Sequence, residues 1–302
     1  MQGKVLVVGS LNMDLIVRAP RLPRGGETLA GHDFSTAAGG KGANQAVAAA
    51  RLGAQVAMIG CVGADAYGQQ LRSGLIEEGI DCAGVETVDG VPTGIASILV
   101  DDAGQNAIVI VAGGNGALTP AHLEAQQHLL AAAQVLIVQL EVPDACVEAA
   151  MRMGREAGCT VILNPAPVAG PLPAHWYAMA DYLIPNESEA AALTGMPVDS
   201  PQSAQLAAHS LLQAGACRVL ITLGAQGVLY ADAEQQRHFT VTPVQAVDTT
   251  AAGDTFVGGF AAALAAGQPL SAAIALGQQA AALAVTRPGA QPSIPYRHEL
   301  PA

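Results

Sequence analysis

Charged and aromatic residues are scarce in this sequence of 302 residues: Asp, Glu, Lys and Arg make up 13% of it, and Phe, Trp and Tyr 3%. The hydrophobic fraction is 51%, which excludes a disordered chain and predicts a large aliphatic core. The formal net charge of −12 argues against nucleic acid or an anionic membrane surface as a partner, because both would repel it. No apolar run reaches the ~18 residues that a membrane span requires, and MQGKVLVVGS is typical of a first strand rather than a signal peptide. We therefore expect a cytoplasmic protein.

Several common motifs are also missing. The five cysteines are odd in number and form no C-x-x-C pair, which argues against a disulfide framework or a zinc site and favours reduced thiols. The seven histidines show no H-E-x-x-H spacing, so we expect them to be structural or exposed. VVGSLN lacks the G-x-G-x-x-G dinucleotide fingerprint, and GGKGAN lacks both the spacing and the Ser or Thr of a Walker A loop.

Short β-branched runs alternate with longer helical patterns. The expected strands are residues 4–9, 55–60, 134–140, 159–164, 181–186 and 218–224, and the expected helices are residues 42–53, 67–80, 120–133, 143–158 and 203–215. This alternation predicts the α/β class, with a doubly wound, mostly parallel sheet flanked by helices. No repeat or linker is visible, so we predict a single domain over residues 1–302.

Two segments, residues 14–36 and 93–111, lack helical periodicity. Their sequences predict antiparallel strands, with turns at PRGGET and DAGQ. Both follow early strands, so they could form one small β-sheet over the active face. A lid and a solvated edge hairpin are both consistent with this pattern. Because the edges of a small exposed sheet are usually covered, often by another copy, we expect a homodimer through the lid.

Polar residues are concentrated at the ends of the expected strands, where ligands bind in open α/β sheets. They occur in LNMD (11–14), GGKGAN (39–44), NPAP (164–167), PNESE (185–189) and TLGAQG (222–227), and at Glu141. The side chains of Asn12, Asp14, Asn44 and Glu141 offer donors and acceptors for several hydroxyl groups. The glycines of GGKGAN would let the backbone approach such a ligand closely. The pattern indicates a polyol site.

The segment VDTTAAGDTF (247–256) places Asp254 at the start of a helix of small and apolar residues. An N-terminal helix cap is the simpler interpretation. The alternative is a general base beside an anion site, because the turn at 251–253 would direct its N–H groups at one point. Phosphoryl transfer requires such a base, together with alignment and charge stabilisation. Asn186 and Glu189 are one helical turn apart, so both could face the phosphates and a hydrated Mg²⁺.

GGKGANQA and DTTAAGDTF resemble the two signatures of the ribokinase-like sugar kinases, and the resemblance extends over nearly the whole chain through LNMD, NPAP, PNESE, TLGAQG and AVTRPGAQPSIP. It implies ATP-dependent phosphorylation of the 5-hydroxyl group of D-ribose, on a doubly wound sheet whose small β-sheet lid clasps a second subunit. Two alternatives stay open: a kinase for 2-deoxyribose or a nucleoside, and a non-catalytic sugar-binding regulator.

The resemblance also implies roles for individual residues and three cofactors, ATP, Mg²⁺ and K⁺. Asp254 would be the base, and the backbone of Ala251, Ala252 and Gly253 the anion hole. The sugar would contact Asn12, Asp14, Gly40, Lys41, Gly42, Ala43, Asn44, Glu141 and Asp254. The nucleotide would contact Asn186, Glu189, Thr222, Leu223, Gly224, Ala225, Gln226, Gly227, Gly253 and Gln278, the last in place of a histidine or asparagine. The K⁺ ligands would be Asp248, Thr250, Ala284, Arg287, Gly289 and Ser293.

Overall fold

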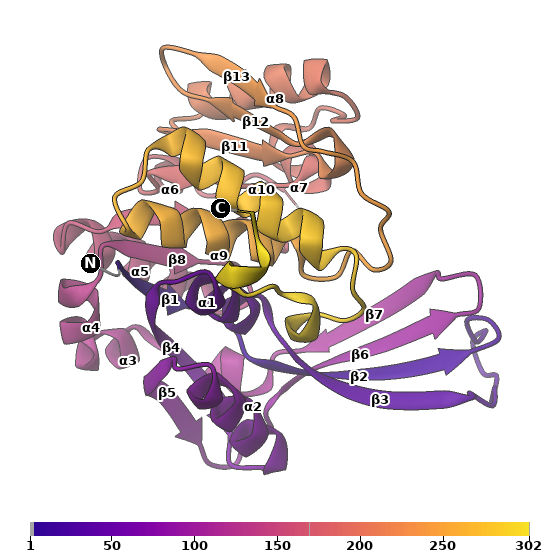
Figure 1. Ribbon diagram of the computed structural model, residues 1–302. Helices are drawn as coiled ribbons and strands as arrows, with labels where there is room; N and C mark the ends of the chain where they lie inside the picture. The colour runs from indigo at the N-terminus through magenta and orange to yellow at the C-terminus, as the bar shows by residue number, and fades with distance from the viewer. Residues whose placement is uncertain (1–2, 169, 302) are drawn as a thin grey trace.

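A large twisted sheet runs through the molecule with helices on both of its faces, and a second, smaller sheet projects from one side (Figure 1). The computed structural model describes residues 3–168 and 170–301. Residues 1, 2, 169 and 302 belong to the predicted domain but lie outside the described residues.

The large sheet has nine strands in the order β13–β12–β11–β10–β9–β8–β1–β4–β5. Its neighbouring strands are parallel except at β11–β12 and β12–β13. The strands are β1 (Lys4–Val8), β4 (Gln55–Gly63), β5 (Asp81–Val88), β8 (Val135–Val138), β9 (Thr160–Leu163), β10 (Tyr182–Leu183), β11 (Val219–Thr222), β12 (Val228–Ala231) and β13 (Gln236–Phe239). This is the doubly wound, mostly parallel sheet that the sequence predicts.

Both faces of the large sheet are buried, which is why its strands are apolar without alternation. In β1, Val5 and Val7 pack on one face while Leu6 and Val8 pack on the other. One face is covered by α1 (Lys41–Arg51), α2 (Ala66–Glu77), α9 (Ala252–Ala265) and α10 (Leu270–Ala284). The other is covered by α3 (Pro120–Ala125), α4 (Gln127–Ala132), α5 (Asp144–Glu156), α6 (Ala174–Tyr177), α7 (Glu187–Thr194) and α8 (Pro201–Gln213).

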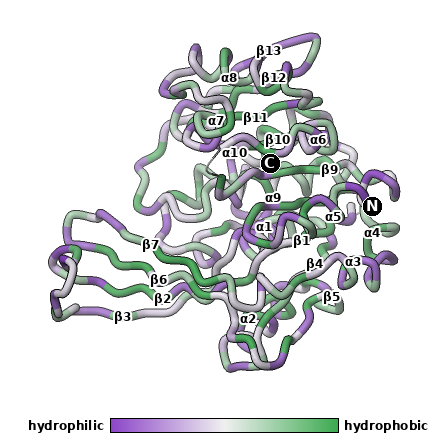
Figure 2. Tube along the Cα trace, turned by 180° about the vertical axis from the view of Figure 1, so that it is seen from behind, coloured by the Kyte–Doolittle hydropathy of each residue, from purple (hydrophilic) through white to green (hydrophobic). Residues whose placement is uncertain are grey.

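The small sheet has four strands in the order β3–β2–β6–β7. They are β2 (Asn12–Ala19), β3 (Asp33–Gly39), β6 (Gly94–Asp101) and β7 (Asn106–Val111), and Figure 2 shows that the turns at the far end of this sheet are hydrophilic. β2–β3 and β6–β7 are antiparallel hairpins, as expected. The expectation was incomplete, because β2 and β6 pair in parallel. Both strands leave the large sheet in the same direction (Figure 1), so the two hairpins meet side by side.

The expected helix over residues 120–133 is wrong as a single element, because it divides at Gln126, whose φ of −108° ends α3. β5, β12 and β13 were not expected as strands. The described residues also form four 3₁₀ turns: η1 (Gly113–Ala117), η2 (Gly224–Gln226), η3 (Gln291–Ser293) and η4 (Arg297–Glu299). The five cysteines are free. Within the described residues, every helix is too short or too polar to cross a membrane.

Candidate active site

The winding direction of the large sheet reverses beside β1, between β1 and β8, and this is where ligands bind in such folds. Ser10 follows β1 and donates a hydrogen bond from Oγ to Oε2 of Glu141, which follows β8, at 2.5 Å. The backbone N–H of Lys41 donates to the same carboxylate oxygen at 3.1 Å. Glu141 therefore joins the start of α1 to the ends of two neighbouring strands.

Two glycines bring the start of α1 against the connection between β1 and β2. Gly40 has a φ of 89°, and a Cβ at this position would lie 2.7 Å from the backbone nitrogen of Asn12. A Cβ on Gly42 would lie 2.5 Å from the backbone nitrogen of Ser10. Ala43 points its methyl group into the core, so it offers a ligand only its backbone. The close approach requires glycine at both positions.

Lys41 supplies positive charge at the centre of the site. Burial lowers the pKa of its ammonium group, but the carboxylates of Asp254, Glu141 and Glu189 raise it, and the net shift is upward. Lys41 is therefore protonated at neutral pH and lies among three acidic groups.

Asn12 is held by a residue that the sequence analysis missed. Its Oδ1 accepts a hydrogen bond from Nδ2 of Asn115 at 2.7 Å, which leaves its own Nδ2 as a donor. Asn115 lies on η1, is itself buried, and also bonds the backbone N–H and carbonyl of Leu11 at 2.8 and 3.0 Å. The one signal in the sequence was an asparagine within the glycine-rich GGNGA, directly after a strand.

Asp14 lies two residues further along β2, and its carboxyl group has no hydrogen-bond partner in the part of the chain that the structure describes. It is only 9% exposed. Burial, followed by the charges of Glu141 and Asp254, raises its pKa to about 7. A carboxyl group in this state can either accept a hydrogen bond from a hydroxyl group or donate one.

Asp254 is the third residue of α9 and is buried. The N-cap of this helix is Ala251, without a side-chain capping bond, so the interpretation of Asp254 as a helix cap is wrong. Its carboxylate instead faces α1, where Oδ2 accepts from Nδ2 of Asn44 at 3.0 Å and Oδ1 accepts from Nε2 of Gln45 at 2.9 Å. Gln45 was not among the expected site residues.

The turn before α9 leaves N–H groups free. Ala251 has a φ of 58°, the one positive value among non-glycine residues in the described part of the chain. Ala252 donates its N–H to the carbonyl of Thr249 at 3.2 Å. The N–H groups of Gly253 and Asp254, in the first helical turn, have no acceptor among the described residues, and such groups favour an anion.

Two cavities meet at this helix start. One, of about 210 Å³, is lined by Lys41, Asn164, Glu189, Ala251 and Asp254, among others. The second, of about 460 Å³, is mainly apolar. Residues common to both are Asn186, Thr222, Thr249, Ala252 and Gly253. A planar ring in the larger cavity would thus be connected to the anion site and to Asp254.

Most of the expected nucleotide residues line the larger cavity. Those in its wall are Asn186, Thr222, Gly224, Ala225, Gly227, Gly253 and Gln278. Leu223 is buried in the core and Gln226 is exposed, and neither residue lines this cavity. Gln278 donates from Nε2 to the carbonyl of Phe239 at 2.9 Å. The sequence analysis missed the apolar wall formed by Val241–Val244 and Ala246.

Asn186 and Glu189 form a reciprocal cap at the start of α7. Oδ1 of Asn186 accepts from the N–H of Glu189 at 2.8 Å, and Oε2 of Glu189 accepts from the N–H of Asn186 at 2.9 Å. Each side chain thus uses one oxygen for the cap, and the expectation that both can face the phosphates and a hydrated Mg²⁺ stays a prediction. Both still line the smaller cavity, and burial raises the pKa of Glu189. One carboxylate with a free oxygen fits Mg²⁺, which usually keeps several waters.

The expected cation ligands come from two segments, 248–250 and 284–293, that lie against each other. Oδ2 of Asp248 accepts from the N–H of Gly289 at 2.8 Å, and Oδ1 accepts from Oγ1 of Thr250 at 2.6 Å. Burial raises the pKa of Asp248, but these hydrogen bonds outweigh it and the net shift is downward. Carboxylate, carbonyl and hydroxyl oxygens suit K⁺, although the Ala284 carbonyl already accepts the N–H of Arg287 at 3.0 Å.

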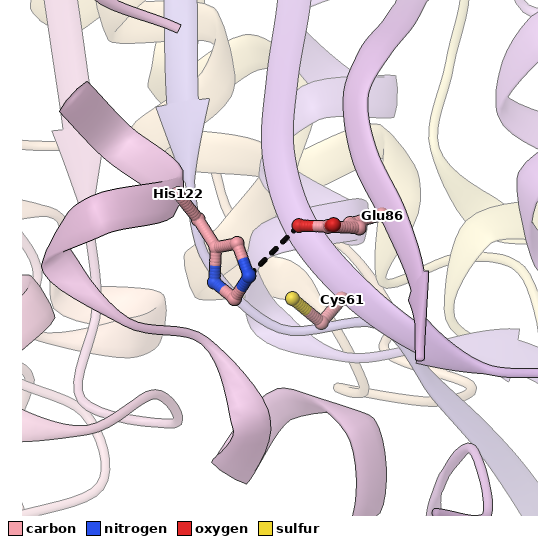
Figure 3. Close-up of side chains that lie close together, drawn as sticks. All are labelled: Cys61, Glu86 and His122. Atoms are coloured by element: carbon pink, nitrogen blue, oxygen red, sulfur yellow. Dashed lines mark ion pairs between the residues drawn. The ribbon is translucent and has the colours of Figure 1, made fainter. Parts of the chain in front are cut away.

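A separate group of side chains, Cys61, Glu86 and His122, lies between β4, β5 and α3 (Figure 3). Nε2 of His122 lies 2.8 Å from Oε2 of Glu86, while Nδ1 accepts the backbone N–H of Thr119 at 2.9 Å. Because Nδ1 is an acceptor, Nε2 carries the ring proton and has no lone pair for a metal. Burial also raises the pKa of Cys61 to about 12, so it stays a thiol. Glu86 and His122 therefore form a hydrogen-bonded contact, with the Cys61 thiol beside it.

A buried carboxylate beside the N–H groups at a helix start, with polar side chains at the strand ends on one side and a larger apolar cavity on the other, fits an ATP-dependent sugar kinase.

Comparison with known proteins agrees with this class. The model of the pfkB family of carbohydrate kinases matches residues 2–297, and the chain belongs to that family. It is 44% identical to a ribokinase of Haemophilus influenzae over 299 residues, 99% of this chain and 97% of the relative. It is 38% identical to a deoxyribokinase of Salmonella typhi over 96% of this chain and 95% of the relative. The solved structure of Arabidopsis thaliana ribokinase with ribose and ATP superposes on this chain with a TM-score of 0.93 at 34% identity. The superposition covers 99% of this chain and 97% of that structure's chain.

Proposed function

We propose that this chain transfers the γ-phosphoryl group of ATP to the 5-hydroxyl group of D-ribose. The observation that carries the proposal is the position of Asp254, held by two amide groups between the hydroxyl-binding side chains and the free N–H groups of α9. The similarity to relatives named ribokinase, and to a structure that holds ribose and ATP, supports this choice of substrate.

Asp254 would accept the proton of the attacking hydroxyl group, and the backbone from Ala251 to Gly253 would bind the transferred phosphoryl group. Lys41 would balance part of the negative charge that gathers there. The other sugar hydroxyls would bind a set of side chains around the ends of β1, β2 and β8: Asn12, Asp14, Asn44 and Glu141. Oδ1 of Asn44 is buried and has no hydrogen-bond partner among the residues that the structure describes, as expected of an acceptor that binds a ligand.

ATP would occupy the larger cavity, with the loop from Thr222 to Gly227 beside it. Mg²⁺, when bound, neutralises charge on the phosphates, and Glu189 and Asn186 would hold it from the smaller cavity.

ADP release by the purified protein with Mg-ATP tests this function directly. Ribose, 2-deoxyribose, fructose and adenosine would be compared at equal concentration. We expect ribose to give the largest kcat/KM. Turnover of 2-deoxyribose equal to that of ribose would favour the alternative of a deoxyribose kinase. One relative, 38% identical to this chain, is named deoxyribokinase. No ADP formation with any acceptor would favour a sugar-binding regulator.

We also propose that K⁺ binds beside the anion hole, because Asp248 connects the turn before α9 to the segment around Gly289. Replacement of Na⁺ by K⁺ in the buffer, at constant ionic strength, is expected to raise kcat. Asp248→Ala should raise the K⁺ concentration for half-maximal activation at least about tenfold, by loss of a charged ligand. Equal activation of the variant and the unmodified protein would contradict this cation site.

The small sheet is proposed as the interface of a homodimer. β7 is exposed along its length, and Ile108, Val109, Ile110 and Val111 are each 47–64% exposed, as is Phe34 on β3 at 60%. Such an apolar edge usually has a partner. Val109→Glu is expected to weaken self-association at least about tenfold by placing an unpaired charge in the interface. Sedimentation velocity would measure this. A monomer at micromolar concentration before mutation would rule the interface out.

A further inference from the structure

A chain of three buried amide side chains, Gln45, Gln139 and Asn164, leads from Asp254 to the ends of two strands of the large sheet. Gln45 lies on α1, Gln139 directly after β8, and Asn164 directly after β9. The two glutamines are fully buried, and Asn164 is 8% exposed. Gln45 is one of the two amides that hold Asp254 in the proposed function, but what orients Gln45 itself has not been described.

Every polar part of the Gln45 amide is occupied. Its Nε2 donates to Oδ1 of Asp254 and to Oδ1 of Asn164, each at 2.9 Å. Its Oε1 accepts from Nε2 of Gln139 at 2.6 Å. The amide therefore cannot turn over without losing all three hydrogen bonds. Its oxygen would then face the acceptor oxygens of Asp254 and Asn164, and its NH₂ group would face the NH₂ group of Gln139.

The main chain determines which way these amides point. Nδ2 of Asn164 donates to the carbonyl of Ile184 at 2.8 Å, and a backbone carbonyl can only accept. Oδ1 of Asn164 must then accept, so Gln45 must present its NH₂ group to it. The second hydrogen of that NH₂ group is thereby directed at Asp254.

From this geometry we propose that Gln45 is a positioning residue for Asp254, and that Asn164, whose own orientation the main chain determines, holds Gln45 in the required orientation. Neutral amide N–H groups stabilise the ionised carboxylate and fix its plane, but they supply no proton that could inactivate it. Together with Asn44 on the other oxygen, Gln45 fixes the direction of the Asp254 carboxylate in a buried site. This inference rests on the proposed function, in which Asp254 is the base.

Two matched substitutions separate positioning from simple packing. Gln45→Met keeps the volume but removes both donors, and it is expected to lower kcat about tenfold or more while the KM for ribose changes less than about twofold. Gln139→Met is the control, because Gln45 would still be held by Asn164 and Asp254. It should lower kcat much less at a comparable loss of thermal stability. Equal kcat values for the two variants would overturn the proposal.

Gln45→Glu adds a readout that a structural role would not change. A carboxyl group facing Asp254 would disfavour its ionisation, so the acid limb of the kcat profile should move to higher pH by about one unit. The other charges that act at Asp254 are Asp14 on β2, Lys41 on α1 and Glu189 on α7, and they are the same in every variant. An unshifted acid limb would contradict the proposal.

The carboxyl ¹³C signal of Asp254, assigned by its absence in Asp254→Asn, gives the same comparison without substrate. It should titrate at higher pH in Gln45→Glu than in the unmodified protein. This signal tests the amide chain even if the unmodified protein fails to phosphorylate ribose, an outcome that would refute the proposed function alone. Identical titration in both proteins would refute the positioning role.

Discussion

Asparagine in place of Asp254 is expected to lower kcat with ribose by about 10²- to 10⁴-fold, the usual contribution of a general base. The side chain keeps its size but can no longer take the hydroxyl proton, and its NH₂ group replaces an oxygen that accepts from Asn44 or Gln45. Because the other sugar contacts remain, the dissociation constant for ribose, measured by calorimetry without ATP, should change little. Steady-state ADP release measures kcat.

Asp89→Asn is the control for this substitution, since Asp89 is an exposed residue in the turn before β6. It should leave kcat unchanged. Full activity of Asp254→Asn would show that Asp254 is not the base, and the hydroxyl proton would then have to leave by another route.

The second large effect concerns stability. Asp14→Asn is expected to raise the free energy of unfolding of the ligand-free protein by up to about 4 kcal/mol above pH 7, at about 1.4 kcal/mol per pKa unit. The folded-state pKa of Asp14, about 7, lies above its ordinary value of 3.8, so ionisation opposes folding. This penalty is absent at a pH below the unfolded-state pKa of 3.8. It grows between that pH and the folded-state pKa, and it is complete above pH 7. Asparagine removes it because it stays neutral.

Urea unfolding at about pH 4, 6 and 8 would measure this difference. The stabilisation by Asp14→Asn should be near zero at the lowest pH and largest at the highest, and the sugar affinity of the variant should fall. Asp89→Asn should show no such trend with pH. A pH-independent difference would mean that Asp14 does not carry an ionisation penalty in the folded state.

Local patterns were sufficient for six of the nine described strands of the large sheet, because a buried strand is specified by residues within its own segment, but they missed β5, β12 and β13. They also located Asn12, Asp14 and Glu141, since strand ends converge in a parallel sheet. The pairing of β2 with β6 was not predictable, because it depends on the direction in which two distant segments leave the large sheet.

The amides around Asp254 were missed for a related reason. Gln45 is 209 residues from Asp254 and 94 from Gln139 in the chain, so no local pattern connects them. A glutamine within GANQAVAAAR is consistent with either an exposed or a buried position on a helix. The capping pair of Asn186 and Glu189 was, by contrast, visible as N-x-x-E before an apolar helix, a recognised cap pattern.

β2 is a strand of the small sheet and also carries part of the proposed sugar site, with Asn12 at its inner end opposite Gly94 of β6. Any rotation of the small sheet about the point where it joins the large one would also move Asn12 and Asp14, because both lie on β2 close to that point. Thermodynamic linkage is reciprocal, so a sugar that favours one orientation of the small sheet must bind more tightly when something else favours that orientation too. In a dimer held through these strands, occupancy of one subunit would then bias the affinity of the other, and ribose binding would be cooperative without any contact between the two sugars.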